Sequence, residues 1–480
     1  MVKIMKNRLQ KIPAGLKSGA VYTFSTIFSR GLAIITVPIF TRLMTTEEIG
    51  IVNLYNSWYS LISTIATLSL TSGGYVIAIK EFEGKRDQYD SSILSLTSFI
   101  AVLIATVYFI VPTFWSNVFG ISGSLICLML IGFLFAPARD FWLARQRYEY
   151  RYKLSGVLSI LSAIVASGLA VFAVISLNRK QSAFVAEGRL YANYIIIYSV
   201  AAVIWLYIML KGKTFYNREF WKYSLRLSLP LVGYSVASQI LTVSDRMMIS
   251  KLIGNSAVGI YGTLYTVSSL SLMLWQAINT SFVPYLFQNI DRKQNNIKTI
   301  SFQLLSVYAG FAILLTLFAP EIVKILATGE YYEAINMMPP IAAGVFFTAI
   351  THLYSNIAVY HKKTKYVMYP ALIAAIINLI LNAICIKPFG YMAAAYTTLF
   401  SYIVLAVLQA MWGRKIHKNI TGTKETVYDD KKFFYLSFAT TAVIMCALIL
   451  YRHTIIRYIV LLVGIILFTI YVWKLIKQLQ

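Results

Sequence analysis

Charged residues are scarce in this chain of 480 residues. Asp, Glu, Lys and Arg together make up 13% of the sequence, whereas 58% of the residues are hydrophobic. Soluble globular domains have roughly a quarter of their residues charged, so the composition argues against a soluble enzyme. Apolar runs recur along the whole chain, and a run of roughly 20 residues is enough to cross a bilayer as a helix. The sequence therefore predicts an all-α polytopic membrane protein.

Cysteine and histidine are also rare. Cys127, Cys385 and Cys446 each lie inside an apolar run, and none belongs to a CxxC pair. The four histidines are scattered, without an HExxH motif. These patterns argue against a disulfide framework and against a metal site built from cysteine or histidine. We expect no catalytic residues, no metal and no cofactor beyond a coupling ion, either H+ or Na+.

Acidic residues are few relative to basic ones, 18 against 43, which gives a net charge of +25. The basic residues lie in short clusters between the apolar runs, a pattern that indicates membrane topology rather than nucleic-acid binding. When the N-terminus is placed in the cytoplasm, most of these clusters fall on the cytoplasmic side. The pattern predicts about 14 transmembrane helices with both termini cytoplasmic. Arg145, Arg147, Arg151 and Lys153 are interpreted mainly as topology anchors.

The first apolar run is too long to be the core of a signal peptide, and it is preceded by a polar, basic segment of about 17 residues. It is interpreted as the first transmembrane helix. The predicted spans are 18–43, 51–79, 91–112, 122–144, 154–177, 190–210, 224–251, 257–287, 300–319, 334–360, 366–386, 391–412, 433–452 and 455–476.

Two stretches that lie 209 positions apart resemble each other. Residues 41–51 and 250–260 both contain a basic residue followed by Leu and, later, a Gly-Ile pair. Helix breakers also correspond, because Gly73 and Gly74 interrupt the second predicted helix and Pro284 interrupts the eighth. Breaks at matching positions of two halves are typical of a transporter cavity. Glycine and proline are, however, common in membrane helices in general.

The repeat predicts two pseudo-symmetric lobes of six helices, related by an axis along the membrane normal. The N-lobe comprises residues 1–215 and the C-lobe residues 216–425. Residues 426–480 follow a polar, charged linker and add helices 13 and 14.

Three motifs carry a resemblance to a known family. They are residues 38–50 (PIFTRLMTTEEIG), residues 244–249 (SDRMMI) followed by Gly259-Ile260-Tyr261, and residues 363–366 (KTKY) leading into Asn378 and Asn382. In this order they resemble the multidrug/oligosaccharidyl-lipid/polysaccharide exporter superfamily, and most of all its Wzx-type flippases of O-antigen and capsule assembly. None of the three is a catalytic signature.

The resemblance implies a flippase. Such a protein moves an undecaprenyl-diphosphate-linked oligosaccharide from the inner to the outer leaflet of the bacterial cytoplasmic membrane by alternating access. Its implied partners are the lipid-linked glycan, membrane lipids, and the polymerase and chain-length regulator of the same pathway, with no nucleic acid. A cation-coupled multidrug exporter and a flippase for a peptidoglycan or teichoic-acid lipid precursor remain alternatives. A membrane sugar polymerase is disfavoured, because every predicted outer loop is short and no acid/base pair is evident.

Arg30 is the strongest single candidate for contact with the substrate. It lies near the middle of the first predicted helix, where a charge is costly unless it meets water, a partner or a ligand. Guanidinium groups match phosphate geometry, so Arg30 could contact the diphosphate headgroup in the cavity. A structural ion pair with Asp140 or Asp245 is the alternative. The repeat-equivalent residue is Gln239, which is polar but uncharged.

Two further charge pairs have open roles. Asp245 could bind a coupling ion, or it could form a salt bridge near the membrane interface while Arg246 extends outward. Arg139 and Asp140 could gate the inner mouth or meet the diphosphate, and they could equally form a boundary charge pair.

Other candidates lie at helix ends or on polar faces. Arg226 could contact the headgroup or anchor topology. Arg42 and Lys251 occupy repeat-related outer ends and could act as gate residues or as interfacial anchors. Two pairs share a helix face at i,i+4 spacing and could bind sugar hydroxyls or hydrogen-bond neighbouring helices. These pairs are His352 with Asn356 and Asn378 with Asn382.

Overall fold

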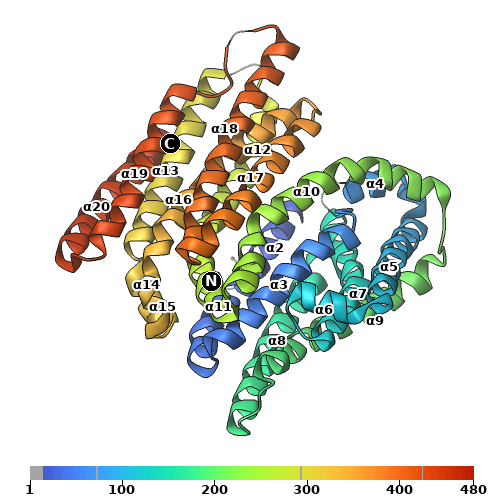
Figure 1. Cartoon of the computed structure of the whole chain (residues 1–480). Helices are drawn as coiled ribbons and strands as arrows, with labels where there is room; N and C mark the ends of the chain where they lie inside the picture. Colours follow the sequence, from blue (N-terminus) through green and yellow to red (C-terminus); the bar gives the residue numbers. More distant parts are fainter. Residues whose placement is uncertain (1–13, 72–73, 292–293, 424, 480) are drawn as a thin grey trace, which may run out of the picture. The chain divides into compact units, whose positions relative to one another are not determined.

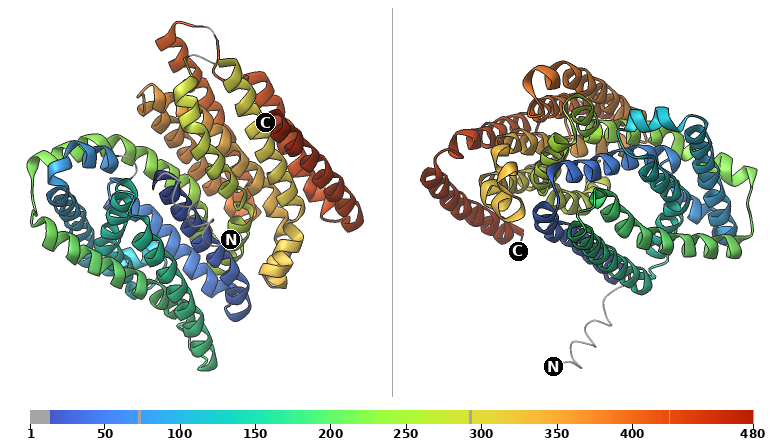
Figure 2. Two further views of the ribbon diagram at one scale, coloured as in Figure 1. Left: turned by 180° about the vertical axis from the view of Figure 1, so that it is seen from behind. Right: turned by 60° about the horizontal axis from the view of Figure 1, so that its bottom comes forward.

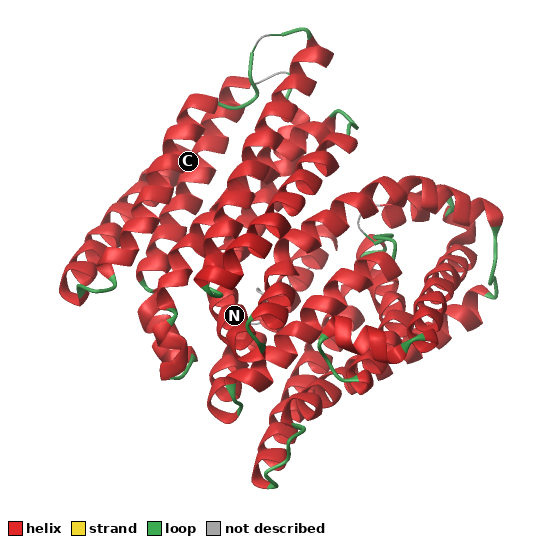
Figure 3. Cartoon of the chain, viewed as in Figure 1, coloured by secondary structure: helices red, strands yellow, loops and turns green. Residues whose placement is uncertain are grey.

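The computed structural model describes residues 14–71, 74–291, 294–423 and 425–479 (Figure 1). Within these residues the chain forms helices joined by short loops and contains no β-strand (Figure 3). The predicted all-α class is confirmed.

Contacts between helices divide the chain into two compact units, Met1–Val236 and Ala237–Gln480. The first unit contains α2 (Ala14–Leu43), α3 (Thr46–Ala66), α4 (Gly74–Glu81), α5 (Arg86–Ile110), α6 (Pro112–Phe119), α7 (Gly123–Tyr148), α8 (Tyr152–Arg179) and α9 (Val185–Gly212). Helix α10 (Arg218–Leu252) belongs to both units.

The second unit continues to the C-terminal helix. It contains α11 (Asn255–Ser268), α12 (Ser271–Asn289), α13 (Gln294–Leu317), α14 (Ala319–Leu326), α15 (Gly329–Glu333), α16 (Met338–Tyr360), α17 (Lys365–Phe389), α18 (Ala393–Thr421), α19 (Asp430–Leu450) and α20 (Thr454–Leu479). This division falls inside α10, and α19 and α20 belong to the second unit.

Eleven helices are long and apolar enough to cross a membrane, or up to thirteen if each of two bent pairs counts as one span. The described residues thus define a multi-pass membrane protein, although the count stays below the predicted fourteen. The difference lies in the predicted span 51–79. Helix α3 ends at Ala66 and α4 begins only at Gly74, so no single helix crosses there.

The start of α3 is specified locally by the sequence. Thr45 accepts a hydrogen bond from the backbone N–H of Glu48 (3.2 Å), and the Glu48 carboxylate accepts one from the Thr45 N–H (2.8 Å). This reciprocal capping box satisfies two N–H groups that would otherwise have no partner at the helix end. It separates α2 from α3 by only two residues.

The helix breaks differ in part from the predicted ones. Gly74 starts α4, and a Cβ there would lie 3.1 Å from the Ser228 hydroxyl; Gly73 lies outside the described residues. The break predicted at Pro284 needs correction, because α12 runs through Pro284. The chain bends instead by 43° between Ser268 and Ser271, where i→i+3 hydrogen bonds tighten the turn. Neighbouring groups in a membrane protein commonly compensate for the N–H that proline lacks.

Aromatic side chains form the core of the first unit. Tyr75, Tyr89, Phe141 and Phe220 are almost fully buried and come from α4, α5, α7 and α10. Their packing joins the start of α10 to α4, α5 and α7. Tyr75 and Tyr89 of this core also carry hydroxyls that reach polar groups, Asp90 and Ser224.

Helix α16 is the central helix of the second unit. Its apolar window is 83% buried, whereas that of α20 is 6% buried, as expected of a helix that faces lipid. The close approach of α16 to α18 depends on Gly344, where a Cβ would lie 3.2 Å from the Leu399 Cα. Such contacts between small residues are a common way to pack membrane helices. The yellow to red helices of this unit run side by side in both views of Figure 2.

Candidate functional site

A fully buried carboxylate lies inside the second unit. Asp245 on α10 accepts hydrogen bonds from the Tyr261 hydroxyl (2.6 Å), the Asn382 amide (2.7 Å) and the Thr398 hydroxyl (2.8 Å). Its exposure is 0%. The three donors come from α11, α17 and α18, so four helices converge on one acidic group.

A second layer of polar groups surrounds this carboxylate. Asn378 accepts hydrogen bonds from the Ser244 hydroxyl (3.0 Å) and from the Asn382 amide (3.1 Å). The Thr397 hydroxyl donates to the Asn382 carbonyl oxygen. We call the set Ser244, Asp245, Tyr261, Asn378, Asn382, Thr397 and Thr398 the Asp245 cluster. All its side-chain oxygens are hard ligands, the kind that alkali and alkaline-earth cations prefer.

Arg246 forms no ion pair with its neighbour Asp245. Its guanidinium donates to the Thr242 carbonyl (2.9 Å) and lies 4.5 Å from the centre of the Tyr265 ring. Successive residues of a helix point in different directions. Asp245 makes no ion pair with any residue in the described part of the chain. A buried carboxylate without a cationic partner is costly in its charged form. Binding of a proton or a cation at Asp245 would lower that cost.

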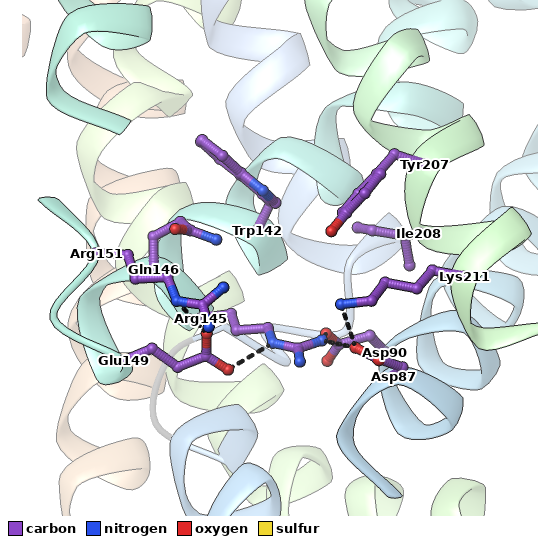
Figure 4. A pocket seen from close by; sticks show the side chains of 10 residues that line it. All are labelled: Asp87, Asp90, Trp142, Arg145, Gln146, Glu149, Arg151, Tyr207, Ile208 and Lys211. Carbon is purple, nitrogen blue, oxygen red and sulfur yellow. Dashed lines mark hydrogen bonds and ion pairs between the residues drawn. The ribbon is translucent and has the colours of Figure 1, made fainter. Parts of the chain in front are cut away.

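The first unit contains a contrasting group of charges, drawn in Figure 4. Arg145 on α7 pairs with Asp87 (2.5 Å) and Asp90 (2.7 Å) on α5, and with Glu149 (2.9 Å), the residue that follows the end of α7. Lys211 on α9 pairs with Asp87 (3.3 Å). We call these five residues the Arg145 cluster. It ties three helices together at one end of the unit.

Both carboxylate oxygens of buried Asp90 have hydrogen-bond partners within the protein, so they need no bound ion. The Tyr75 hydroxyl donates to one of its oxygens (2.7 Å), and Arg145 occupies the other. Both partners are protein groups, and Tyr75 belongs to the aromatic core. The Arg145 cluster therefore has a structural role, beyond the topology anchoring that the sequence indicated for Arg145.

The remaining predicted charges lie apart from these clusters. Arg30 belongs to α2, but its side chain lies outside the described residues. Arg139 reaches the Ser162 hydroxyl at 3.5 Å, and Asp140 is exposed on α7. Arg226 is exposed on α10, and Gln239 is half-buried there.

The two predicted outer-end residues are found at helix ends. Arg42 donates to the Pro38 carbonyl (2.9 Å) near the end of α2. Lys251 is exposed near the end of α10. A basic side chain at a helix C-terminus is favourable because of the helix dipole.

The two polar pairs at i,i+4 spacing, His352 with Asn356 and Asn378 with Asn382, have different surroundings. The Trp275 indole N–H donates to His352 (3.0 Å) and the Asn356 amide donates to Asn279 (3.0 Å), so this pair connects α16 to α12. Asn378 and Asn382 are fully buried in the Asp245 cluster. In this conformation both pairs make contacts between helices rather than lining an open sugar-binding surface.

Sequence reasoning identified Asp245, Asn378 and Asn382 but did not connect them. Asn382 and Thr398 lie more than 130 residues from Asp245 in the chain. The i,i+4 spacing of the asparagines marks one polar helix face. Nothing in their spacing indicates that this face meets α10, and Thr397 and Thr398 carry no such signal.

The comparisons with known proteins agree with this fold. The family model described as polysaccharide biosynthesis protein matches residues 16–290, and a MatE family model matches residues 230–384. The first match covers more than half of the chain, so this protein belongs to the polysaccharide biosynthesis protein family. The predicted superfamily is thereby confirmed.

Individual relatives support the same assignment. The chain is 23% identical over 403 residues, 80% of each chain, to a protein named probable low-salt glycan biosynthesis flippase Agl15 from Haloferax volcanii. It resembles a structure of the lipid II flippase MurJ in an inward closed conformation, with a TM-score of 0.65, 16% identity and coverage of 96% of this chain and 99% of that one.

A second structural likeness is to an inward-facing multidrug resistance MATE family transporter of the MOP superfamily. Its TM-score is 0.59 at 15% identity, covering 84% of this chain and 96% of that one. At such identities the structural likenesses establish the fold alone. Taken with the family match, they indicate a transporter rather than a catalytic enzyme.

Proposed function

We propose that this protein moves an undecaprenyl-diphosphate-linked oligosaccharide, such as an O-antigen or capsule repeat unit, across the bacterial cytoplasmic membrane. The glycan travels from the inner to the outer leaflet by alternating access, and both termini lie in the cytoplasm. The observation that carries the proposal is the polysaccharide biosynthesis family match over more than half of the chain. The similarity to a protein named as a glycan biosynthesis flippase supports the same substrate class.

The partners of the buried carboxylates favour a substrate with an anionic headgroup over a cationic drug. Asp87 and Asp90 are paired with Arg145, and Asp245 is enclosed by neutral donors. A cationic drug would need an accessible carboxylate. Of the two candidate carboxylates Asp140 and Asp245, Asp140 alone is exposed, so it is the group that the exporter alternative would use.

Basic residues are proposed to receive the diphosphate. Arg30, Arg139 and Arg226 are the candidates, because a guanidinium binds phosphate oxygens through two parallel N–H groups. Arg226 is exposed on α10. The prenyl tail would stay in lipid while the lobes change access.

We further propose that the Asp245 cluster binds the coupling ion. A proton or Na+ would neutralise the buried carboxylate, which is otherwise enclosed by hydroxyl and amide groups of α11, α17 and α18. Since four helices meet there, binding or release of the ion would change their packing. That change is a means of coupling an ion gradient to alternating access.

The test uses a deletion strain of the source organism and a membrane-impermeant probe for the lipid-linked glycan. Without the protein, the glycan should accumulate on the cytoplasmic face. Wild type should restore its outward movement, and Arg30→Ala should not. Arg179→Ala, which alters an exposed arginine at the end of α8, is the matched control and should restore it.

Other outcomes would assign the protein elsewhere. Normal sidedness of the glycan together with new sensitivity to cationic drugs would contradict the proposal and favour the exporter. Accumulation of a peptidoglycan or teichoic-acid precursor instead would keep the flippase and change its substrate. Rescue by Arg30→Ala would leave the flippase intact and remove Arg30 from the headgroup site.

A further inference from the structure

A groove in the first unit lies outside the sites described above. It has a volume of about 720 Å³ and is formed by the end of α7, the start of α8 and the second half of α9. Volumes of about 300–1,000 Å³ are typical of small-molecule sites. Neither the proposed headgroup residues nor the Asp245 cluster contributes to it.

The wall of the groove is apolar. Leu154 and Leu158 line it from α8, and Val203 and Ile204 line it from α9. Leu154 is 64% exposed and Val203 is 67% exposed. Leu158 lies six residues into α8, which corresponds to about 9 Å along the helix axis at 1.5 Å per residue. This wall is long enough to hold part of an acyl chain.

The rim of the groove carries positive charge at a helix end. Arg151 and Lys153 line it beside the aromatic rings of Tyr150 and Tyr152. Arg151 has a side-chain exposure of 70% and contacts Glu149 at 3.3 Å, but Glu149 is already bound by Arg145 at 2.9 Å. Lys153 is exposed and pairs with no carboxylate in the described part of the chain.

Helix α8 begins at the same rim. Its N-cap residue Arg151 makes no side-chain capping hydrogen bond, and a helix N-terminus bears a partial positive charge. Tyrosines at such a position are typical of the membrane–water interface. An apolar wall below a cationic, aromatic rim matches one chemical class, a lipid with an anionic headgroup.

We propose that this groove binds an anionic phospholipid, with its phosphodiester at Arg151 and Lys153 and an acyl chain along Leu154, Leu158 and Val203. The proposed function places both termini of the chain in the cytoplasm. With that orientation, on which this detail rests, the lipid belongs to the cytoplasmic leaflet. The Arg145 cluster contains two cations and three carboxylates, so Arg151 beside Glu149 brings the local charge to zero and Lys153 leaves one positive charge at the rim. A phosphodiester, with a single negative charge, balances it. A lipid-linked diphosphate carries more charge and a bulky glycan.

Trp142 lines the groove, so its fluorescence can report whether a lipid is bound there. Figure 4 shows Trp142 and Tyr207, which lines the groove as well, on the same side of the Arg145 cluster. Bromine atoms on an acyl chain quench a tryptophan that they contact. The full-length protein would be placed in phosphatidylcholine nanodiscs containing brominated phosphatidylglycerol or, in parallel, brominated phosphatidylcholine. The signal of Trp142 is the difference between wild type and Trp142→Phe.

Brominated phosphatidylglycerol should quench Trp142 at a lower mole fraction than brominated phosphatidylcholine does. The R151Q/K153Q variant should lose this preference, by about fivefold for each cation removed. The matched control R179Q/K180Q removes two exposed charges from the opposite end of α8 and should keep the preference. Val203→Phe should reduce quenching by both lipids, because it fills the groove and leaves the rim charges in place.

Three results would overturn the proposal. One is equal quenching of wild type by both brominated lipids, and another is an unchanged preference in R151Q/K153Q. The third is displacement of the brominated lipid by a polyprenyl diphosphate at lower mole fraction than by unlabelled phosphatidylglycerol, which would make the groove a substrate site. Lipid binding is measured without transport, so a failure here is separate from a failure of the proposed flippase.

Discussion

The two units each contain a buried carboxylate, but the groups that bind the two carboxylates differ in charge. Asp90 in the first unit is 3% exposed and is held by Arg145, whereas Asp245 in the second unit is 0% exposed and is held only by neutral donors. A carboxylate paired with a guanidinium has no need of a mobile ion. A carboxylate surrounded by hydroxyls and amides still carries a charge that must be balanced. The comparison separates a structural ion cluster from a proposed ion-exchange site.

The largest effect should come from removing the shared cation of the Arg145 cluster. Arg145→Met leaves Asp90 buried and unpaired, and breaking a buried ion pair from one side costs about 3–5 kcal/mol. We expect a large loss of folded protein, measured by thermal unfolding in detergent. Adding Asp90→Asn to the variant should recover much of the loss, because the uncompensated charge is then removed. No recovery would show that the cost comes from elsewhere.

Asp245→Asn should have the opposite profile, with activity lost and folding retained. Asparagine keeps the size of the side chain but has no negative charge for a proton or Na+ to neutralise. Coupling free energies between sites are typically 1–3 kcal/mol, so transport driven by an ion gradient should fall by about fivefold or more. The measurement is glycan translocation in proteoliposomes with a Na+ or a proton gradient imposed separately. Glu330→Gln, at an exposed position in the short helix α15, is the control. Unchanged gradient dependence in Asp245→Asn would remove this residue from coupling.

Tyr261→Phe tests whether the neutral donors hold the carboxylate. The variant deletes one hydrogen bond of 2.6 Å to Asp245 and should destabilise the protein by about 1–3 kcal/mol. In a double-mutant cycle with Asp245→Asn, the two changes should be strongly non-additive. The same cycle with Arg246→Gln should be close to additive, because Arg246 contacts Thr242 and Tyr265 instead. Strong coupling between Arg246 and Asp245 would contradict the contrast between the two units.

The smallest effect is expected at the edge of the Arg145 cluster. Lys211 has a side-chain exposure of 43% and Asp87 one of 36%. Exposed ion pairs contribute about 0–1 kcal/mol because water and salt screen them. Lys211→Gln should therefore lower thermal stability only slightly. A loss as large as that of Arg145→Met would mean that the cluster acts as one unit, with no distinction between its core and its edge.

Much of the fold follows from properties of the sequence that act locally. Long apolar runs predict membrane helices without reference to tertiary contacts, and the observed helices follow those runs. The break between α3 and α4 was marked by glycine. The bend between α11 and α12 was not, because it falls at Ser269 and Leu270 while Pro284 is accommodated inside a continuous helix.

The site was only partly predictable for the same reason. A charge inside an apolar run is visible in sequence, so Asp245 was identified as a candidate. Its partners Tyr261, Asn382 and Thr398 depend on how α10, α11, α17 and α18 pack, which no local pattern encodes. Arg145 illustrates the reverse case. A basic residue near a helix end looked like a topology anchor, and only the packing of α5 against α7 brings two carboxylates to it.

Translocation of a lipid-linked glycan is the activity that we propose for this protein. The most direct measurement places the purified protein in proteoliposomes with the lipid-linked oligosaccharide and follows, over time, the fraction that an impermeant sugar-modifying reagent can reach. Wild type should raise that fraction well beyond the level in protein-free vesicles, and Asp245→Asn should slow the rise under an ion gradient. A fraction that stays at the protein-free level, in vesicles where the same protein exports a cationic dye, would contradict the claim.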